Sequence, residues 1–131
     1  MDNAVTHYYG SNAAVTSSSN AETLTTKATY FKNLRGADGE VSFVANWTAN
    51  TYTIAYVLSG GNVGANAPTT GTYDQVVEIS HPTRVGYTFT KWTISGMDGV
   101  THYYGETNTV SSNTTNSTLD TTVTFFKNLR S

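Results

Sequence analysis

The stretch Thr6–Gly10, which reads THYYG, returns unchanged at Thr101–Gly105, and FKNLR at Phe31–Arg35 returns at Phe126–Arg130. Both pairs are separated by 95 residues, and an ungapped alignment of the two intervals gives 16 identities in 30 positions. Self-similarity at a fixed long period is typical of tandem arrays. We therefore expect this 131-residue chain to be a fragment of a longer repeat protein.

The identities cluster at the two ends of the repeated interval. The middles differ, and both are rich in Ser, Thr and Asn: SNAAVTSSSNAETLTTKATY in the first copy and ETNTVSSNTTNSTLDTTVTF in the second. A polar segment that tolerates change predicts an exposed loop held between two structured ends.

The composition favours strands over helices. Thr, Ser and Asn together account for 49 of 131 residues. Thr suits a pleated surface because its Cβ is branched, whereas the good helix formers are scarce in this chain. Nine Tyr, five Phe and two Trp supply large apolar side chains, and there are no cysteines for disulfides. The expected fold class is mostly β, stabilised by packing.

Charge and hydropathy exclude two classes of partner. Only 12% of residues are charged and the net charge is −2, so there is no basic surface for nucleic acid. No window approaches the roughly 18 apolar residues that a membrane-spanning helix needs, so we expect no membrane insertion.

Alternating apolar residues predict several strands. These are Val41–Trp47, Tyr52–Leu58, Val76–Ser80, Tyr87–Ile94 and Thr121–Phe126, with Lys27–Phe31 as the earlier copy of the last. In Tyr52–Leu58 the inward side chains should be those at positions 52, 54, 56 and 58, and in Val76–Ser80 those of Val77 and Ile79. Only residues 62–70 leave room for one short helix.

Four motifs fall in the order of a known family. The segments YTIAYVLSGGN (52–62), APTTGTY (67–73), HPTRVGYTFTKW (81–92) and VANW (44–47) resemble the Listeria-Bacteroides repeat, a relative of the internalin B-repeat. The chain departs from the family at Lys91, where Gly is usual, and in the long segment 101–120. The resemblance implies a β-grasp-like unit, α+β with at most one short helix, in an extracellular protein on a bacterial cell surface.

The resemblance also implies where each repeat begins and ends. A family unit would start near Tyr52 and close with a strand like Val41–Trp47, which here precedes it. The expected domains are therefore 1–50, the C-terminal part of one repeat, and 51–131, the N-terminal part of the next without its closing strand.

An open strand edge with an apolar face is costly in water, so we expect the closing strand to pair. Val41–Trp47 could fold back onto Thr121–Phe126 in the same chain, or be donated to a neighbouring molecule, giving a strand-swapped dimer or a head-to-tail chain. In either assembly, a local hairpin with Lys27–Phe31 has the lowest loop-closure cost. The residues expected to take part in pairing between repeats or in self-association are Val41, Phe43, Ala45, Trp47, Val123 and Phe125.

No pattern indicates catalysis, a cofactor or a metal. His7, His81 and His102 lack the spacing of metal ligands and are expected in solvent or in turns. Neither a nucleophile motif nor a paired-acid motif occurs, so we expect no enzyme activity. Trp47 and Trp92 each end an apolar strand and are expected in the core.

The expected function is a structural or adhesive repeat, a stalk or spacer whose partners are adjacent repeats or itself. The alternative is a module that binds carbohydrate or a host ligand, with loops 10–23 and 105–118 beside an aromatic platform of Tyr8, Tyr9, Tyr103 and Tyr104. The competing interpretation of each tyrosine pair is one buried and one exposed ring, as alternation along a strand dictates.

Overall fold

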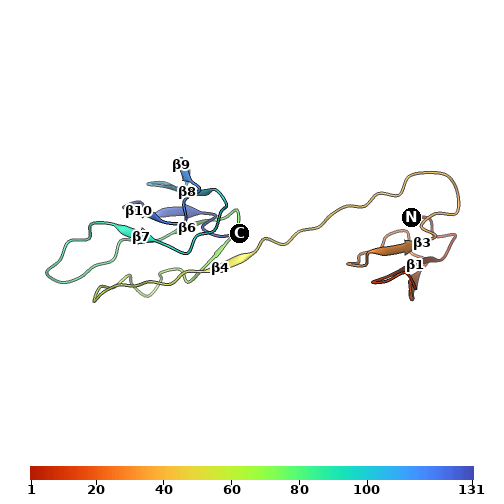
Figure 1. Cartoon of the computed structure of the whole chain (residues 1–131), viewed down its shortest axis with the longest axis horizontal. Coiled ribbons are helices and arrows are strands. Elements are labelled where there is room, and N and C mark those ends of the chain that lie inside the picture. Colours follow the sequence, from red (N-terminus) through yellow and green to blue (C-terminus); the bar gives the residue numbers. More distant parts are fainter. The chain divides into compact units, whose positions relative to one another are not determined.

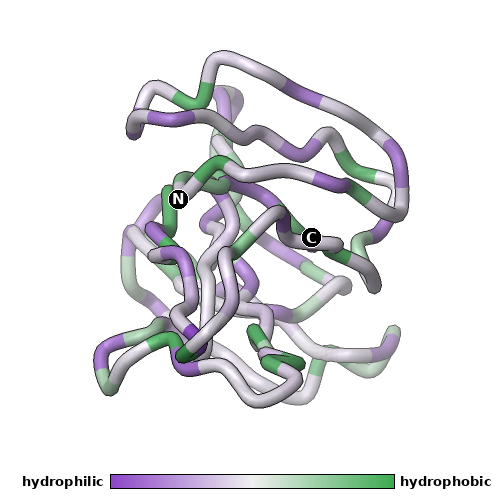
Figure 2. Tube along the Cα trace, turned by 90° about the vertical axis from the view of Figure 1, so that its left-hand side faces the viewer, coloured by the Kyte–Doolittle hydropathy of each residue, from purple (hydrophilic) through white to green (hydrophobic).

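The computed structural model describes all residues 1–131, and every regular element in it is a strand (Figure 1). The chain divides into two units, Met1–Asn46 and Trp47–Ser131. The mostly β prediction is confirmed, and residues 62–70 form no helix. No helix is available that could cross a membrane. Apolar residues occur along the trace singly or in short runs (Figure 2).

The first unit is one antiparallel sheet of three short strands, in the order β2-β1-β3. The strands are β1 (His7–Gly10), β2 (Ser17–Ser19) and β3 (Tyr30–Lys32). The polar middle of the repeat, expected to be a loop, thus supplies a strand. Its Ser side chains can form a strand because an antiparallel sheet can face water on one side.

The second unit holds eight strands in three small antiparallel sheets. The four-stranded sheet has the order β6-β11-β8-β9, and the pairs β4-β5 and β10-β7 lie beside it. The strands are β4 (Thr51–Thr53), β5 (Thr70–Thr72), β6 (Val76–Glu78), β7 (Trp92–Ile94), β8 (His102–Gly105), β9 (Ser112–Thr114), β10 (Leu119–Thr121) and β11 (Phe125–Lys127).

The core of the second unit is built around Phe126, whose side chain is fully buried in the central strand β11. The buried apolar residues around it are Tyr52, Ile79, Met97 and Leu129. Ile54, Tyr56, Val77 and Trp92 pack against this cluster from partly exposed positions. The predicted inward residues Val77 and Ile79 are therefore confirmed, as is the alternation over Tyr52–Leu58.

Several predicted strands are shorter than expected. Tyr52–Leu58 keeps its alternating burial, but its ladder covers only Thr51–Thr53. Tyr87–Ile94 is a strand only from Trp92. Thr121–Phe126 is divided between the end of β10 and the start of β11, and in the break Thr121 Oγ1 accepts a hydrogen bond from the Val123 amide at 3.2 Å.

Candidate functional site

The repeated sequence folds in the same way twice. In the first copy Tyr8 pairs with Ser18 and Lys32, and in the second Tyr103 pairs with Asn113 and Lys127. Every pairing in β1-β2-β3 recurs in β8-β9-β11 at the 95-residue offset. Sequence similarity therefore extends to identical strand register.

A buried histidine fixes each copy. His7 and His102 are fully buried, which corrects the expectation that they lie in solvent or turns. Nδ1 of His7 donates to the Asn33 carbonyl at 2.7 Å, and Nδ1 of His102 donates to the Asn128 carbonyl at the same distance. Both Asn residues have a φ of 58°. Asn tolerates this left-handed conformation better than most residues, which explains its place in FKNLR.

The duplication extends further than the sequence alignment indicated. Asp2 accepts hydrogen bonds from the amides of Ala4 and Gly36, and Asp98 accepts them from the amides of Ser131 and Val100. These bonds hold the pKa of each carboxyl below its usual range. The sequence shows the similarity too: residues 1–10 read MDNAVTHYYG and residues 97–105 read MDGVTHYYG. One extra residue in the first copy hides this similarity from an ungapped alignment.

The two copies differ in what covers them. Strand β11 pairs on one edge with β8 and on the other with β6. Its counterpart β3 pairs only with β1. Phe126 is consequently fully buried, whereas the equivalent Phe31 is half-buried and meets Phe43 edge-on, with ring centroids 5.3 Å apart.

The residues 41–47, named here the ribbon, form no strand, which corrects the expected closing strand and its local hairpin. Phe43 and Trp47 are 69% and 89% exposed, and Ala45 is also exposed, while Val41 is half-buried. Trp47 is therefore not in the core. The hairpin prediction relied on a short loop, but loop-closure cost grows slowly with length, so proximity alone does not select a partner.

The predicted cis partner of the ribbon is already engaged. Phe125 lies in β11, where it faces Glu78 of β6 and Gly105 of β8. Val123 is partly buried against the core. Because both edges of β11 are occupied, Phe125 and Phe126 offer no free edge to the ribbon, and the ribbon does not pair with them in this structure. The participation of these residues in pairing between molecules stays a prediction.

The tyrosine pairs lie on β1 and β8. Tyr8 is 36% exposed, Tyr9 and Tyr103 are half-buried, and Tyr104 packs against the core. The Lys127 ammonium lies 5.2 Å from the ring centre of Tyr103, and Lys32 lies 5.7 Å from that of Tyr8. A cation thus occupies one ring face in each copy.

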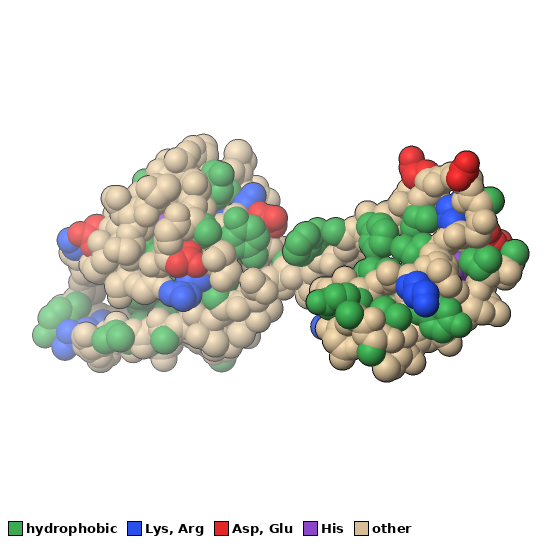
Figure 3. Space-filling view, turned by 45° about the vertical axis from the view of Figure 1, so that its right-hand side comes forward, with side chains coloured by type: hydrophobic (Ala, Val, Ile, Leu, Met, Phe, Trp, Pro, Cys, Tyr) green, Lys and Arg blue, Asp and Glu red, His purple; other side chains and the backbone are tan.

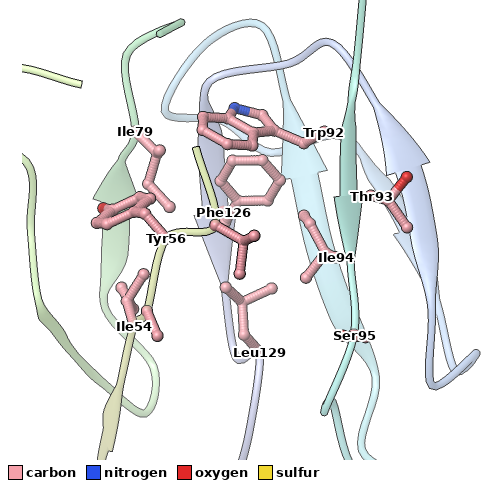
Figure 4. Close-up of a pocket in the computed structure, with 11 residues that line it drawn as sticks. Ile54, Tyr56, Ile79, Trp92, Thr93, Ile94, Ser95, Phe126 and Leu129 are labelled. Atoms are coloured by element: carbon pink, nitrogen blue, oxygen red, sulfur yellow. The ribbon is translucent and has the colours of Figure 1, made fainter. Parts of the chain in front are cut away.

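Between Ile54–Val57 and Trp92–Ser95 the second unit has an open apolar groove of about 190 Å³ (Figure 4). Ile54 and Tyr56 line one side, Trp92 and Ile94 the other, and Phe126 lies between them. The groove lining also contains Ala55, Val57, Ile79, Thr93, Ser95 and Leu129. None of these side chains is charged, so the groove suits an apolar occupant.

Outside the groove, the polar and apolar side chains of the surface form no further site. No three His, Asp or Glu side chains converge as metal ligands would. Lys91 contacts Asp120 at 2.9 Å, and this hydrogen bond lowers the pKa of the exposed carboxyl. Apolar side chains reach the surface in several patches (Figure 3). Outside the ribbon, the large apolar side chains with the highest exposed fractions are those of Val57 and Val85.

No protein-family model, curated protein or solved structure matches the chain. The resemblance to the Listeria-Bacteroides repeat therefore rests on the four motifs alone.

Proposed function

We propose that this chain is a structural or adhesive repeat module of a bacterial cell-surface protein, acting as a stalk or spacer. The observation that carries the proposal is that the three-stranded arrangement β2-β1-β3 recurs as β9-β8-β11. Both copies have the same register, a buried histidine and a left-handed Asn. A unit copied at fixed spacing is how arrays gain length, since each copy contacts its neighbours only.

The segment that joins the two units is a second observation that supports a spacer. Residues 36–50 lie between the hairpin β1-β2-β3 and β4, and they form no ladder until Thr51. A segment of this kind that joins folded units without pairing to them would add to the length of every repeat. We interpret the second unit as a helix-free relative of the β-grasp repeat, in keeping with the motif resemblance.

Scattering from engineered arrays tests this function. Proteins with one, two and four head-to-tail 95-residue periods should show a maximum dimension that rises by a constant increment per period. Collapse into one globule would instead give growth close to the cube root of mass and would contradict a spacer. A matched array with Phe126→Ala in every copy controls for folding of the units.

The alternative, a carbohydrate- or host-ligand-binding module, gains no specific support from the tyrosines. Tyr104 is turned toward the core, and Lys127 lies over the Tyr103 ring, where a sugar would stack. A glycan array with Tyr103→Ala beside the unaltered chain tests it. Saturable binding that the substitution abolishes would favour the alternative.

A further inference from the structure

The groove of the second unit is bounded by the extension of β4 at Ile54–Val57 and by β7, and the backbone facing the groove has no partner on either side. Strand β4 pairs with β5, and the Ile54 amide still donates to the Thr69 carbonyl at 2.8 Å on that side. Successive amides of a strand point to opposite edges, so the next amide, that of Ala55, points away from β5. It has no backbone partner.

The opposite side of the groove is similar. Strand β7 pairs with β10 in a two-stranded sheet, which leaves its second edge free. Thr93 and Ser95 line the groove together with Trp92 and Ile94 (Figure 4). Two unpaired edges beside an apolar floor form an acceptor for one added strand, because main-chain hydrogen bonds and side-chain burial are both unsatisfied there.

The chain also carries a suitable donor. The ribbon alternates Val41, Phe43, Ala45 and Trp47 with Ser42, Val44 and Asn46, as a strand with one buried face requires. Its seven residues would span about 23 Å when extended. It contains no charged side chain, and neither does the groove, so filling the groove with it buries no charge.

The geometry points to an exchange of strands between copies of this chain. The ribbon of one molecule lies between Ile54–Val57 and β7 of a second molecule, with its Phe43 and Trp47 side chains on the floor formed by Ile79 and Phe126. The inference rests on the proposed function, since it describes how copies of the repeat would join. Each chain carries one ribbon and one such groove, so copies can form a reciprocal pair or a head-to-tail chain.

A second copy is the occupant that fits the structure. Only residues 48–50 separate the ribbon from β4, yet the ribbon forms no ladder. Each chain therefore carries one unfilled groove and one unpaired ribbon. Donation between molecules satisfies both, and it leaves the β6–β11–β8 pairing untouched.

The first test compares the association of two doubly substituted chains by sedimentation velocity. Phe43→Asn with Trp47→Asn changes the ribbon at exposed positions and should weaken association by about 100-fold or more. The matched control, Val85→Asn with Tyr87→Asn, changes side chains that are 100% and 66% exposed elsewhere, and should associate like the unaltered chain. Equal association of both variants would overturn the proposal.

The second test alters the acceptor. Ala55→Pro removes an amide that has no partner within the molecule, so folding should survive, while groove pairing loses a donor. The Ala55→Pro chain and the ribbon variant should each associate weakly. Their mixture should form a 1:1 complex, because one retains the donor and the other the acceptor. A mixture that stays monomeric would overturn the proposal, with circular dichroism reporting that both variants are folded.

Amide hydrogen exchange distinguishes donation of the ribbon to a second molecule from binding of the ribbon in the groove of its own molecule. Protection of the ribbon amides should rise with protein concentration. Protection that is independent of concentration in a monomer would mean that each groove takes its own ribbon, and this overturns the second copy as occupant. A folded monomer at about 1 mM with an unprotected ribbon would overturn strand exchange but leave the spacer function, which array scattering tests separately.

Discussion

The duplicated phenylalanines allow the core to be tested against a built-in control. Phe126 is fully buried, and truncating such a residue to Ala costs about 3–5 kcal/mol through lost burial and the cavity left behind. The second unit runs from Trp47 to Ser131, 85 residues by subtraction, for which a total stability of about 4–13 kcal/mol is typical. Phe126→Ala should therefore unfold the second unit or lower its Tm by about 15–30 °C.

Tryptophan fluorescence during thermal or urea unfolding measures this effect. Trp92 packs against the core, whereas Trp47 is 89% exposed, so the change in emission reports the second unit. Phe31→Ala is the matched control. It removes the same side chain from a half-buried position in the first unit and should cost about 1 kcal/mol without moving the Trp92 transition. Equal shifts for the two substitutions would refute the assignment of Phe126 as the centre of the core.

Three further predictions concern single contacts. Gly71→Ala should destabilise the second unit by about 1–3 kcal/mol, since a Cβ there would overlap the buried Tyr52 ring, whereas Gly99→Ala, with open space around it, should change urea unfolding little. Asn128→Gly keeps the positive φ but loses the hydrogen bonds of the Asn128 side chain to Asp74; we expect a loss of about 1–3 kcal/mol by the same assay, and no loss would show these bonds to be dispensable. Folding lowers the pKa of Asp98, so the ionised carboxylate stabilises the folded state above the unfolded pKa of about 4, and this stabilisation is lost as the pH falls through the pKa of the folded state. Asp98→Asn should therefore flatten the fall of Tm below about pH 4. An unchanged profile of Tm against pH would contradict this.

Local features of the fold were predictable because they depend on neighbouring residues. The repeat indicated two copies with structured ends, and the alternation in Tyr52–Leu58 correctly identified the side chains that face the core. The inward side chains of Val77 and Ile79 followed from the same period-two pattern. Such features require only that one face of a strand be apolar.

The pairing partners were not predictable in the same way. The alternation at Val76–Ser80 indicated a strand but not its partner, so it could not reveal that β6, far from β11 in sequence, would occupy the second edge of β11. The ribbon was predicted to be a strand but forms none. Its pattern is that of a buried strand, but a strand needs a partner edge, and alternation says nothing of where that edge lies.

The two copies of the hairpin separate what the local sequence encodes from what the rest of the chain supplies. Register, the His–Asn hydrogen bond and the left-handed Asn are the same with and without β6 beside them. The hairpin geometry therefore does not depend on the core. Burial does depend on it: Phe31 and Phe126 have the same sequence neighbours from Lys to Arg but very different exposure. A module of this kind presents a preformed sheet to which other strands can be added, and the groove between Ile54–Val57 and β7 offers another such edge.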